Sequence, residues 1–230
     1  MHQERLREEQ GLIIAIDGPA GAGKSTVARL LASRLGYLYL DTGALYRALA
    51  WKVRTASVDP DDPAAVADLL SSTRLHMECG VEQAHVFVDG CEVTGELRSP
   101  DITALASVVS AIPAVREWLL PVQREIAARG SVVAEGRDIG TRVFPRADIK
   151  FFLEADAEVR ASRRHRELVD AGHNVAFDQT KRDLTGRDDR DRSRAVAPLV
   201  PAPDAERIDT SSMPADAVVD LMLAAITARS

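Results

Sequence analysis

The sequence contains few cysteines and no long hydrophobic run. Cys79 and Cys91 are its only cysteines, it has no C-x-x-C pair, and no histidines stand at metal-ligand spacing. A disulfide scaffold and a zinc site are therefore not indicated, and both thiols are expected to be free. No apolar run approaches the roughly 20 residues of a membrane-spanning helix, and residues 1–10 are charged, without the hydrophobic region of a signal peptide. We expect a cytoplasmic protein that does not bind membranes.

The sequence also lacks an excess of positive charge. The chain has 29 lysines and arginines against 35 aspartates and glutamates, a formal net charge of −6, which argues against a general nucleic-acid-binding protein. The length of 230 residues allows one large domain or two small ones. Because repeats, low-complexity tracts and Ser/Gly-rich linkers are absent, we expect one domain. Arginines gather toward the C-terminal end, where they can form a site for a polyanion within an acidic protein.

The most informative segment is a glycine-rich loop between an apolar strand and an amphipathic helix. Residues 12–17 form an apolar run that ends in an aspartate, residues 18–25 read G-x-x-x-x-G-K-S, and apolar residues recur at helical spacing from Val27 to Leu35. In this P-loop pattern the glycines let backbone N–H groups approach phosphate oxygens, and the N-terminus of the helix adds its positive partial charge. A glycine-rich turn without a ligand is the alternative interpretation.

The side chains of this loop have distinct expected roles. Lys24 is expected to bridge the β- and γ-phosphates of a nucleoside triphosphate, and the Ser25 hydroxyl to complete the shell of a Mg²⁺ ion. By itself the loop predicts nucleotide binding and nothing more. The residues expected to bind the nucleotide are Gly18, Pro19, Ala20, Gly21, Ala22, Gly23, Lys24, Ser25 and Thr26.

Strands and helices alternate along most of the remaining chain. Further strands are expected at residues 37–40, 131–135, 149–153 and, as a weaker candidate, 207–209. Helices are expected from a cap at Asp41 or Thr42 to about Arg54, and at 115–128, 157–169 and 215–228. Alternation of this kind is typical of a parallel sheet with helices on both faces. The sequence therefore predicts an α/β fold of three layers with a five-stranded parallel sheet.

One region departs from this alternation. Between Ser72 and Thr94, three short runs are separated by Gly80 and by Asp89-Gly90, and the second separator is typical of a hairpin turn. Short strands joined by tight turns pair antiparallel. We therefore predict a small antiparallel β insert within the single domain.

Charged residues follow two of the predicted strands at the edge of the sheet where the P-loop lies. Ligands of open α/β sheets bind at the carboxyl ends of the strands. Arg47 lies one helical turn beyond Gly43 after the second strand, and Arg137 and Asp138 follow the third. An arginine can fix a phosphate while a neighbouring carboxylate accepts a hydrogen bond from a base or a sugar. A surface arginine and a loop-closing ion pair are the respective alternatives.

The densest run of charge in the chain extends from Arg187 to Arg194. On a helix, Arg187, Asp191 and Arg194 fall at i, i+4 and i+7 and share one face, with Arg190 beside them. Such a run is usually a solvated face with ion pairs along it. Here the arginines outnumber the carboxylate on their face, so an anionic ligand would neutralise the surplus charge, as phosphoryl transfer requires.

Four segments of the chain together resemble a known family. They are GPAGAGKST, DTGALYR, EGRDIGTRVFP and RDDRDRSRAVAPL, and in this order they are similar to the bacterial cytidylate kinases, members of the nucleoside monophosphate kinase group, over residues 11–213. The resemblance implies a P-loop kinase fold, transfer of a phosphoryl group from ATP, with Mg²⁺, to CMP or dCMP, and a monomer. It also implies a division of the single domain 1–230 into a P-loop core (11–69 and 108–230) with a lid near 166–185, and a monophosphate-binding insert (70–107).

The resemblance further implies roles for individual residues. It assigns the acceptor phosphate to Arg47, Arg137 and Arg194, the cytosine edge to Ser107, Arg116 and Asp138, and the sugar hydroxyls to Arg187 and Asp191. The remaining substrate-binding residues that it implies are Thr42 and Tyr46. The residues that it implies for catalysis are Lys24, Arg137, Arg187 and Arg194.

Two other functions agree with the P-loop and the sheet. A kinase for another small acceptor, such as UMP, AMP or shikimate, would keep both features and differ in its acceptor preference. A regulatory switch that binds a nucleotide to change its partner contacts would need a catalytic water or a partner surface, and it would leave the arginine face unexplained. Acceptor-dependent release of ADP distinguishes these alternatives from a cytidylate kinase.

Overall fold

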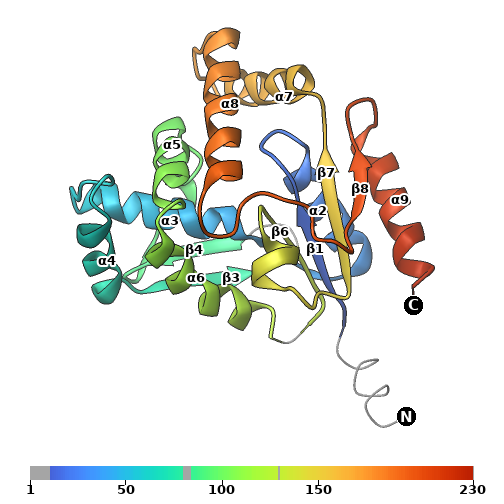
Figure 1. Cartoon of the computed structure of the whole chain (residues 1–230), viewed down its shortest axis with the longest axis horizontal. Helices are drawn as coiled ribbons and strands as arrows, with labels where there is room; N and C mark the ends of the chain where they lie inside the picture. The colour runs from blue at the N-terminus through green and yellow to red at the C-terminus, as the bar shows by residue number, and fades with distance from the viewer. Residues whose placement is uncertain (1–10, 80–83, 129, 230) are drawn as a thin grey trace.

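The computed structural model of the chain describes residues 11–79, 84–128 and 130–229. Its main element is a five-stranded sheet in the order β2-β6-β1-β7-β8, in which every neighbouring pair is parallel. The strands are β1 (Ile13–Asp17), β2 (Leu38–Asp41), β6 (Val132–Gly136), β7 (Ile149–Glu154) and β8 (Glu206–Asp209). They are the five strands predicted from the sequence, and β1, which precedes the P-loop, lies at the centre (Figure 1).

The apolar residues of the central strand belong alternately to the two faces of the sheet, as the period of a strand requires. On one face, Ile14 and Ile16 pack with helices α2 (Lys24–Leu35) and α9 (Ala215–Thr227), whereas Ala15 lies in the cluster on the other face. All three side chains are completely buried. A strand covered on both faces needs such a continuous apolar run, and the predicted three-layer fold is confirmed.

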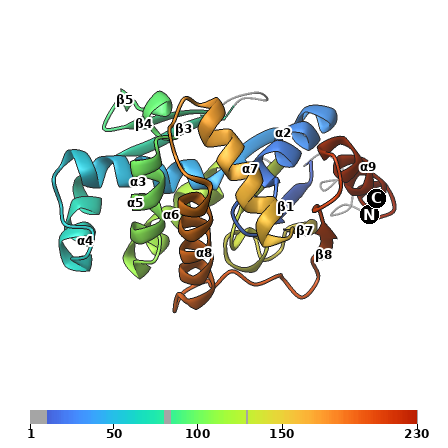
Figure 2. The same cartoon turned by 90° about the horizontal axis from the view of Figure 1, so that it is seen from above.

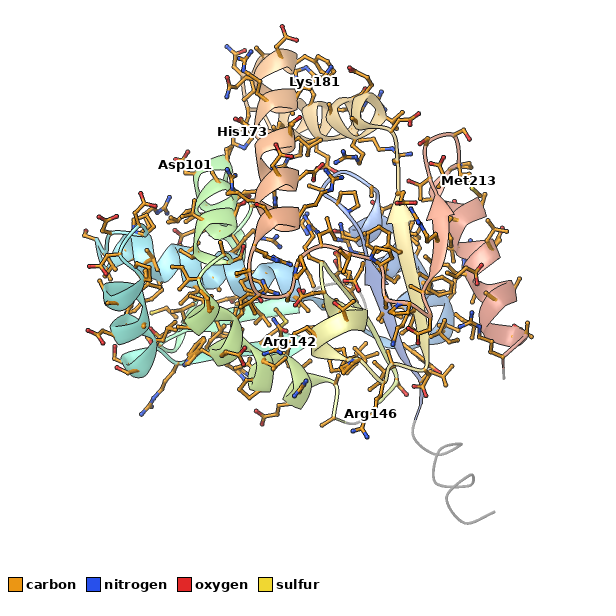
Figure 3. The ribbon with its side chains drawn as sticks, in the orientation of Figure 1. Asp101, Arg142, Arg146, His173, Lys181 and Met213 are labelled. Atoms are coloured by element: carbon orange, nitrogen blue, oxygen red, sulfur yellow. The ribbon has the colours of Figure 1, made fainter. Side chains whose placement is uncertain are left out.

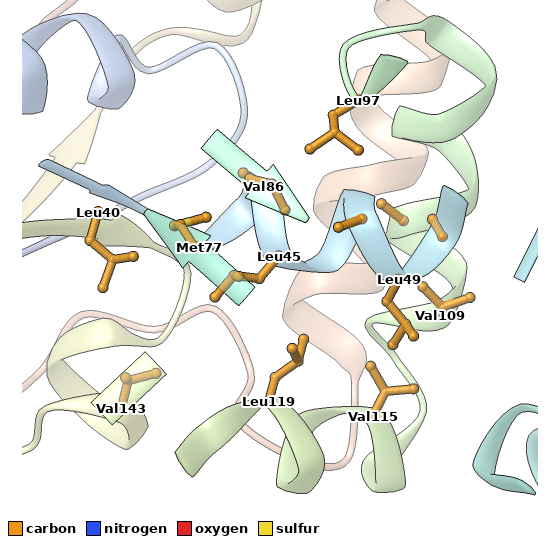
Figure 4. Packing of buried hydrophobic residues seen from close by; sticks show 14 of the residues in the cluster. Leu40, Leu45, Leu49, Met77, Val86, Leu97, Val109, Val115, Leu119 and Val143 are labelled. Atoms are coloured by element: carbon orange, nitrogen blue, oxygen red, sulfur yellow. The ribbon is translucent and has the colours of Figure 1, made fainter. Parts of the chain in front are cut away.

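The second face of the sheet is covered by a larger apolar cluster. The helices that contribute to it are α3 (Thr42–Thr55), α4 (Pro63–Ser72), α5 (Pro100–Val109) and α6 (Pro113–Ile126). Figure 4 shows Leu45 of α3 between a small second sheet and Leu119 of α6. Because α3 is held on two sides, the residues of its first turns have fixed positions at the edge of the main sheet.

The predicted antiparallel insert is present as this second sheet. Its strands, paired in this order, are β3 (Leu75–Cys79), β4 (Ala84–Val88) and β5 (Cys91–Glu92). Asp89 and Gly90 join β4 to β5 with φ of 53° and 83°, the left-handed backbone that a tight hairpin turn needs. Cys91 is a free, exposed thiol, as expected. The turn predicted at Gly80 and the side chain of Cys79 lie outside the described residues.

Two further helices, α7 (Ala157–Asp170) and α8 (Phe177–Ser193), pack on each other beyond the carboxyl ends of the parallel strands (Figures 1 and 2). α7 follows β7, and α8 carries most of the dense charged run. Two short turns complete the fold, a 3₁₀ turn η1 (Thr94–Glu96) and a π-helical turn η2 (Ile139–Val143). None of the described helices is long and apolar enough by itself to cross a membrane, although α5 and α6, bent by 103°, pass that test as a pair on length and composition.

Candidate active site

The P-loop connects the end of β1 to the start of α2 and approaches two other elements closely. Gly18 has a φ of 148°, and a Cβ there would lie 2.2 Å from the carbonyl oxygen of Leu153 in β7. Gly21 has a φ of 75°, and a Cβ there would lie 2.8 Å from the carbonyl oxygen of Arg160 in α7. Only glycine meets both demands. The loop is therefore held between the sheet and α7.

Lys24 folds back onto the loop that carries it. Its Nζ donates a hydrogen bond to the carbonyl oxygen of Pro19 (2.8 Å), and the residue is 5% exposed. Burial, followed by the charge of Arg137, lowers the pKa of Lys24 to about 7. An anionic ligand on the loop would stabilise the charged form of this lysine.

Asp41 organises the first turns of α3. One carboxylate oxygen caps the helix by accepting a hydrogen bond from the backbone N–H of Ala44 (3.0 Å), and the other accepts one from Nη2 of Arg47 (2.6 Å). Burial raises the pKa of Asp41, but the Arg47 guanidinium and the other donors outweigh it and hold the pKa below its usual value. The Thr42 hydroxyl donates to the carbonyl oxygen of Glu135 (2.7 Å) at the end of β6. These bonds fix Arg47 beside the P-loop.

Arg116 of α6 and Asp138, which follows β6, form a buried ion pair. Nη1 of Arg116 also donates to the carbonyl oxygen of Ser110 (3.2 Å), and its guanidinium carbon lies 5.4 Å from the centre of the Tyr46 ring, within the range of a cation–π contact. Each contact restricts the guanidinium further. Asp138 is therefore held in one position by a group that is itself immobilised.

The segment after β6 also meets the charged run of α8. Nε of Arg137 donates to Oδ2 of Asp191 (2.8 Å), while two guanidinium nitrogens of Arg194 lie 3.5 Å from Asp191 and 3.6 Å from Asp138. Burial raises the pKa of Asp191, but Arg137 and Arg187 outweigh it, so the net pKa is lowered. Among the described residues Arg187 has no ion-pair partner, and burial together with Arg137 lowers its pKa to about 9. Positive charge therefore exceeds negative charge here.

The helix predicted to carry Arg194 ends one residue earlier, at Ser193. Arg194 has extended backbone, with φ of −62° and ψ of 140°, and its Nε donates to the carbonyl oxygen of Ala197 (2.5 Å). The chain leaves the helix axis at this point because it must return to β8. That turn lets the Arg194 side chain approach Asp138 instead of continuing the helical face.

Asp17, the last residue of β1, holds the segment that carries Asp138. Its carboxylate accepts hydrogen bonds from the backbone N–H groups of Ile139 and Gly140, both at 2.7 Å. Burial raises the pKa of Asp17 to about 6 in spite of these two bonds. The strand before the P-loop thus positions the start of η2, and a single π-helical turn of this kind is common at functional sites.

These groups surround one pocket of about 290 Å³, between the P-loop, the start of α3, α5, the segment after β6, and α7 and α8. The predicted residues that line it are Ala20, Gly21, Gly23, Lys24, Ser25, Thr26, Thr42, Tyr46, Arg47, Arg116, Arg137, Asp138, Arg187, Asp191 and Arg194. Gly18, Pro19 and Ala22 belong to the same loop without lining this pocket. The chain thus brings together residues from its N-terminal and C-terminal parts.

Ser107 was predicted to contact the base. In the part of the chain that the structure describes, it does not line this pocket. It lies in α5, is 3% exposed, and its Oγ accepts a hydrogen bond from Nε of Arg190 (3.1 Å). Ser110, one turn later, lines the pocket, and its hydroxyl donates to the carbonyl oxygen of Ser107 (3.1 Å). The Arg190 side chain covers Ser107 and joins α8 to α5.

Other charged residues line the pocket without having been predicted as site residues. Arg29, Arg98 and Arg164 add positive charge, and Asp41, Glu135 and Glu167 add negative charge. Glu135 is buried and accepts a hydrogen bond from the Tyr39 hydroxyl (2.6 Å). Glu135 could have been predicted as a site residue, because it lies at the carboxyl end of a predicted strand. Arg98 gave no such indication, because it reaches the pocket from the insert. Arg164 belongs to a cluster with Arg163 and Arg166 on the helix predicted at 157–169, a pattern that favours a closing lid.

A second pocket of about 380 Å³ adjoins the P-loop on the side of α7 and α9. It shares Gly21, Gly23, Thr26 and Glu167 with the first pocket. Arg163 borders it and donates to the carbonyl oxygen of Thr210 (2.6 Å). Met213, labelled near the start of α9 in Figure 3, lines it as well. The two pockets thus meet at the P-loop.

Comparison with known proteins gives one consistent result. The family model for cytidylate kinase matches residues 14–228. A cytidylate kinase from Pelotomaculum thermopropionicum is 51% identical over 94% of this chain and 96% of that protein, and one from Symbiobacterium thermophilum is 46% identical over 92% and 94%. A solved shikimate kinase from Acinetobacter baumannii in complex with shikimate is 20% identical over 98% of both chains, with a TM-score of 0.47. The chain belongs to the cytidylate kinase family.

Proposed function

We infer that this protein is a cytidylate kinase, which transfers the γ-phosphoryl group of ATP to CMP or dCMP and releases ADP and CDP or dCDP. The observation that carries the inference is a single pocket in which the P-loop lysine, Lys24, is joined by Arg137, by Arg187 and by the Arg116–Asp138 ion pair. Membership of the cytidylate kinase family supports the same acceptor.

The donor nucleotide is proposed to lie along the two adjoining pockets. Its phosphates would meet the backbone N–H groups of the P-loop and the N-terminus of α2, and its nucleoside would extend into the second pocket, past Arg163. Lys24 would exchange its bond to the Pro19 carbonyl for one to a phosphate oxygen. The exchange replaces a neutral acceptor with a charged one, which favours the bound state.

Magnesium is the proposed metal cofactor. The Ser25 hydroxyl and the Glu135 carboxylate line the same pocket as Lys24, and hard oxygen ligands of this kind suit Mg²⁺. No group of three or more histidine, cysteine or acidic side chains within the described ranges is placed to hold a metal ion, so the ion would share these few protein oxygens with phosphate and water. When bound, it neutralises phosphate charge.

The acceptor phosphate is proposed to bind Arg47, Arg137 and Arg194, and the sugar hydroxyls to bind Arg187 and Asp191. All five line the first pocket. Arg187 has no ion-pair partner among the described residues, so an anionic acceptor would supply the counter-charge that the fold does not.

The base is proposed to be recognised by Arg116 and Asp138. Asp138 can accept a hydrogen bond from the amino group of cytosine, and Arg116 can donate to the ring nitrogen or carbonyl. Uracil would present an oxygen to the carboxylate, and a buried mismatch of that kind is costly. Ser110 already lines the pocket, whereas Ser107 would have to exchange its bond from Arg190 for one to the base.

The chemistry proposed is direct in-line transfer with no covalent enzyme intermediate. The acceptor phosphate is already anionic and needs no strong general base, so the enzyme supplies positioning and charge neutralisation. The side chains proposed for this are Lys24, Arg137, Arg187 and Arg194. Water has to be excluded once both nucleotides are bound, or ATP would be hydrolysed. The insert and the lid near 166–185 are the elements proposed to close.

The proposal also covers assembly and location. We expect a monomer in the cytoplasm whose partners are its small-molecule substrates, without nucleic acid or membrane, and with the core, lid and insert divided as predicted above. Light scattering on the purified protein tests the first point. A mass near 24.9 kDa supports it, and a stable mass of twice that value contradicts it.

The function itself is tested by release of ADP from ATP in the presence of one acceptor at a time. We expect turnover with CMP and dCMP at a kcat/KM at least ~100-fold above that with UMP, AMP or shikimate, the difference that one buried polar mismatch allows. A higher kcat/KM with another acceptor would assign the enzyme to that acceptor. Release of ADP that does not depend on any acceptor would instead support a nucleotide-dependent switch.

A further inference from the structure

A buried ion pair outside the pocket joins α7, α8 and the P-loop. Arg160 of α7 is 6% exposed, and Asp188 of α8 is 2% exposed. Nη1 of Arg160 donates to Oδ2 of Asp188 (2.6 Å) and to the carbonyl oxygen of Ala20 in the P-loop (3.0 Å). Its Nε donates to the carbonyl oxygen of Ala155 (3.1 Å), just before α7. One guanidinium therefore holds three separate parts of the chain.

Apolar contacts reinforce the same junction. Ala20 of the P-loop, Ala161 of α7 and Leu184 of α8 form a small buried cluster, with Phe177 packed against it. This cluster is distinct from the two larger clusters on the faces of the main sheet. The close approach of Gly21 to the backbone of α7 belongs to the same contact. The two helices are thus packed directly on the phosphate-binding loop.

The ion pair lies next to the pocket on α8, because Asp188 is one helical turn from both Leu184 and Asp191, which line the first pocket. Arg187 and Asp191 line the first pocket, whereas Asp188 does not. The second carboxylate oxygen of Asp188 is buried and has no hydrogen-bond partner among the described residues. Arg160 is therefore the group that compensates the Asp188 charge, and loss of either partner would leave the other charge buried and unpaired. The junction therefore ties the position of the P-loop to that of α8.

We propose that Arg160 and Asp188 are positioning residues that couple the two nucleotide sites. A nucleotide on the P-loop fixes Ala20, and through Arg160 and Asp188 it fixes α8 in the position where Arg187 and Asp191 meet the acceptor. Because such coupling is reciprocal, the acceptor favours the same loop position and tightens donor binding by the same factor. This inference rests on the proposed function, since it takes the first pocket as the acceptor site.

The test compares Asp188→Asn with Asp189→Asn, the same chemical change one residue along α8 at an exposed position. The dissociation constant of CMP is measured by calorimetry with and without a saturating non-hydrolysable ATP analogue. For the parent and Asp189→Asn we expect the analogue to tighten CMP binding by about fivefold or more, the lower end of typical coupling. For Asp188→Asn we expect a change of less than about twofold, with the affinity for CMP alone nearly preserved.

Two results overturn the proposal: coupling of parental size in Asp188→Asn, or no coupling in the parent. A purely structural role for Asp188 would lower thermal stability and leave the coupling ratio of the folded fraction unchanged. If Asp188→Asn does not fold, Arg160→Lys replaces it, because one ammonium cannot bond Ala155, Ala20 and Asp188 together as the guanidinium does. Coupling of parental size in that variant also overturns the proposal. The measurement uses binding alone, so it is separate from the turnover assay that tests the proposed function.

Discussion

Lys24 is a buried lysine, and its burial disfavours the charged form of the side chain. Its pKa of about 7 implies that it is largely neutral at pH 8 in the free enzyme. A bound triphosphate stabilises the charged form and raises this pKa, so the enzyme takes up a proton on binding. We expect uptake of about one proton at pH 8, and an affinity that falls as the pH rises above 7.

Calorimetry of an ATP analogue in two buffers of different ionisation enthalpy measures this uptake. In Lys24→Met the uptake should disappear at whatever affinity remains. Equal uptake in the parent and in Lys24→Met would show that another group takes up the proton.

Asp138 is the side chain on which acceptor choice is expected to depend. Asparagine in its place can donate to the oxygen of uracil and no longer offers a charged acceptor to the amino group of cytosine. We expect Asp138→Asn to lower the ratio of kcat/KM for CMP over UMP by about tenfold or more, equivalent to about 1.4 kcal/mol.

The ratio is informative because the fraction of folded enzyme cancels in it. Asp189→Asn, on the exposed side of α8, serves as the control and should keep the parental ratio. An Asp138→Asn variant that prefers CMP as strongly as the parent would remove Asp138 from base recognition.

Residues in local motifs could be predicted from the sequence, whereas residues defined by distant partners could not. Lys24, Arg137 and Asp138 follow predicted strands, and the carboxyl ends of parallel strands share one edge. In contrast, the bond between Arg160 and Asp188 joins residues 28 positions apart. The bond from Arg190 to Ser107 spans 83 positions. Nothing in the local pattern shows that such a pair will meet.

The conformation of the P-loop depends on its close contact with β7. A Cβ on Gly18 would lie 2.2 Å from the carbonyl oxygen of Leu153, and its φ of 148° is strained for other residues. We therefore expect Gly18→Ala to destabilise the protein by about 2 kcal/mol or more and to weaken ATP binding, because the loop must shift to relieve the overlap.

Gly95→Ala is the matched control, because a Cβ there would meet nothing within 4 Å. Urea denaturation of both variants measures the difference in the free energy of unfolding. If Gly18→Ala and Gly95→Ala are equally stable, the contact between the P-loop and β7 does not constrain the loop.

Whole elements differed in how readily the sequence predicted them. All five strands of the main sheet were predicted. Four are short apolar runs because both of their faces are covered, whereas the edge strand β8 has one buried residue and was a weaker candidate. α5 was not predicted, although Ser99 caps it and Pro100 occupies its first turn, both start signals in the sequence. Without that helix, the sequence did not predict that Ser110 lies beside Arg116, whose Nη1 donates to the carbonyl oxygen of Ser110. α8 ends before Arg194 because the chain turns back toward β8. The periodicity of the helix gives no information about that turn.

Positive and negative charge are distributed unevenly over the molecule. The chain carries a net charge of −6, yet the first pocket is lined by Arg47, Arg98, Arg137, Arg187 and Arg194 among other groups. A positively lined cleft in an otherwise acidic protein focuses the field on anionic ligands and disfavours long polyanions elsewhere on the surface. This arrangement agrees with the proposed site for two nucleotides.

The central claim is that both nucleotides occupy one water-excluding site, so that the phosphoryl group passes to the acceptor and not to water. Chromatographic measurement of ADP, CDP and free phosphate in one reaction tests this claim. We predict equal amounts of ADP and CDP with CMP present and, without CMP, ADP formation slower by about 100-fold or more, equivalent to about 2.7 kcal/mol. ADP and free phosphate formed at a similar rate without CMP would contradict the account.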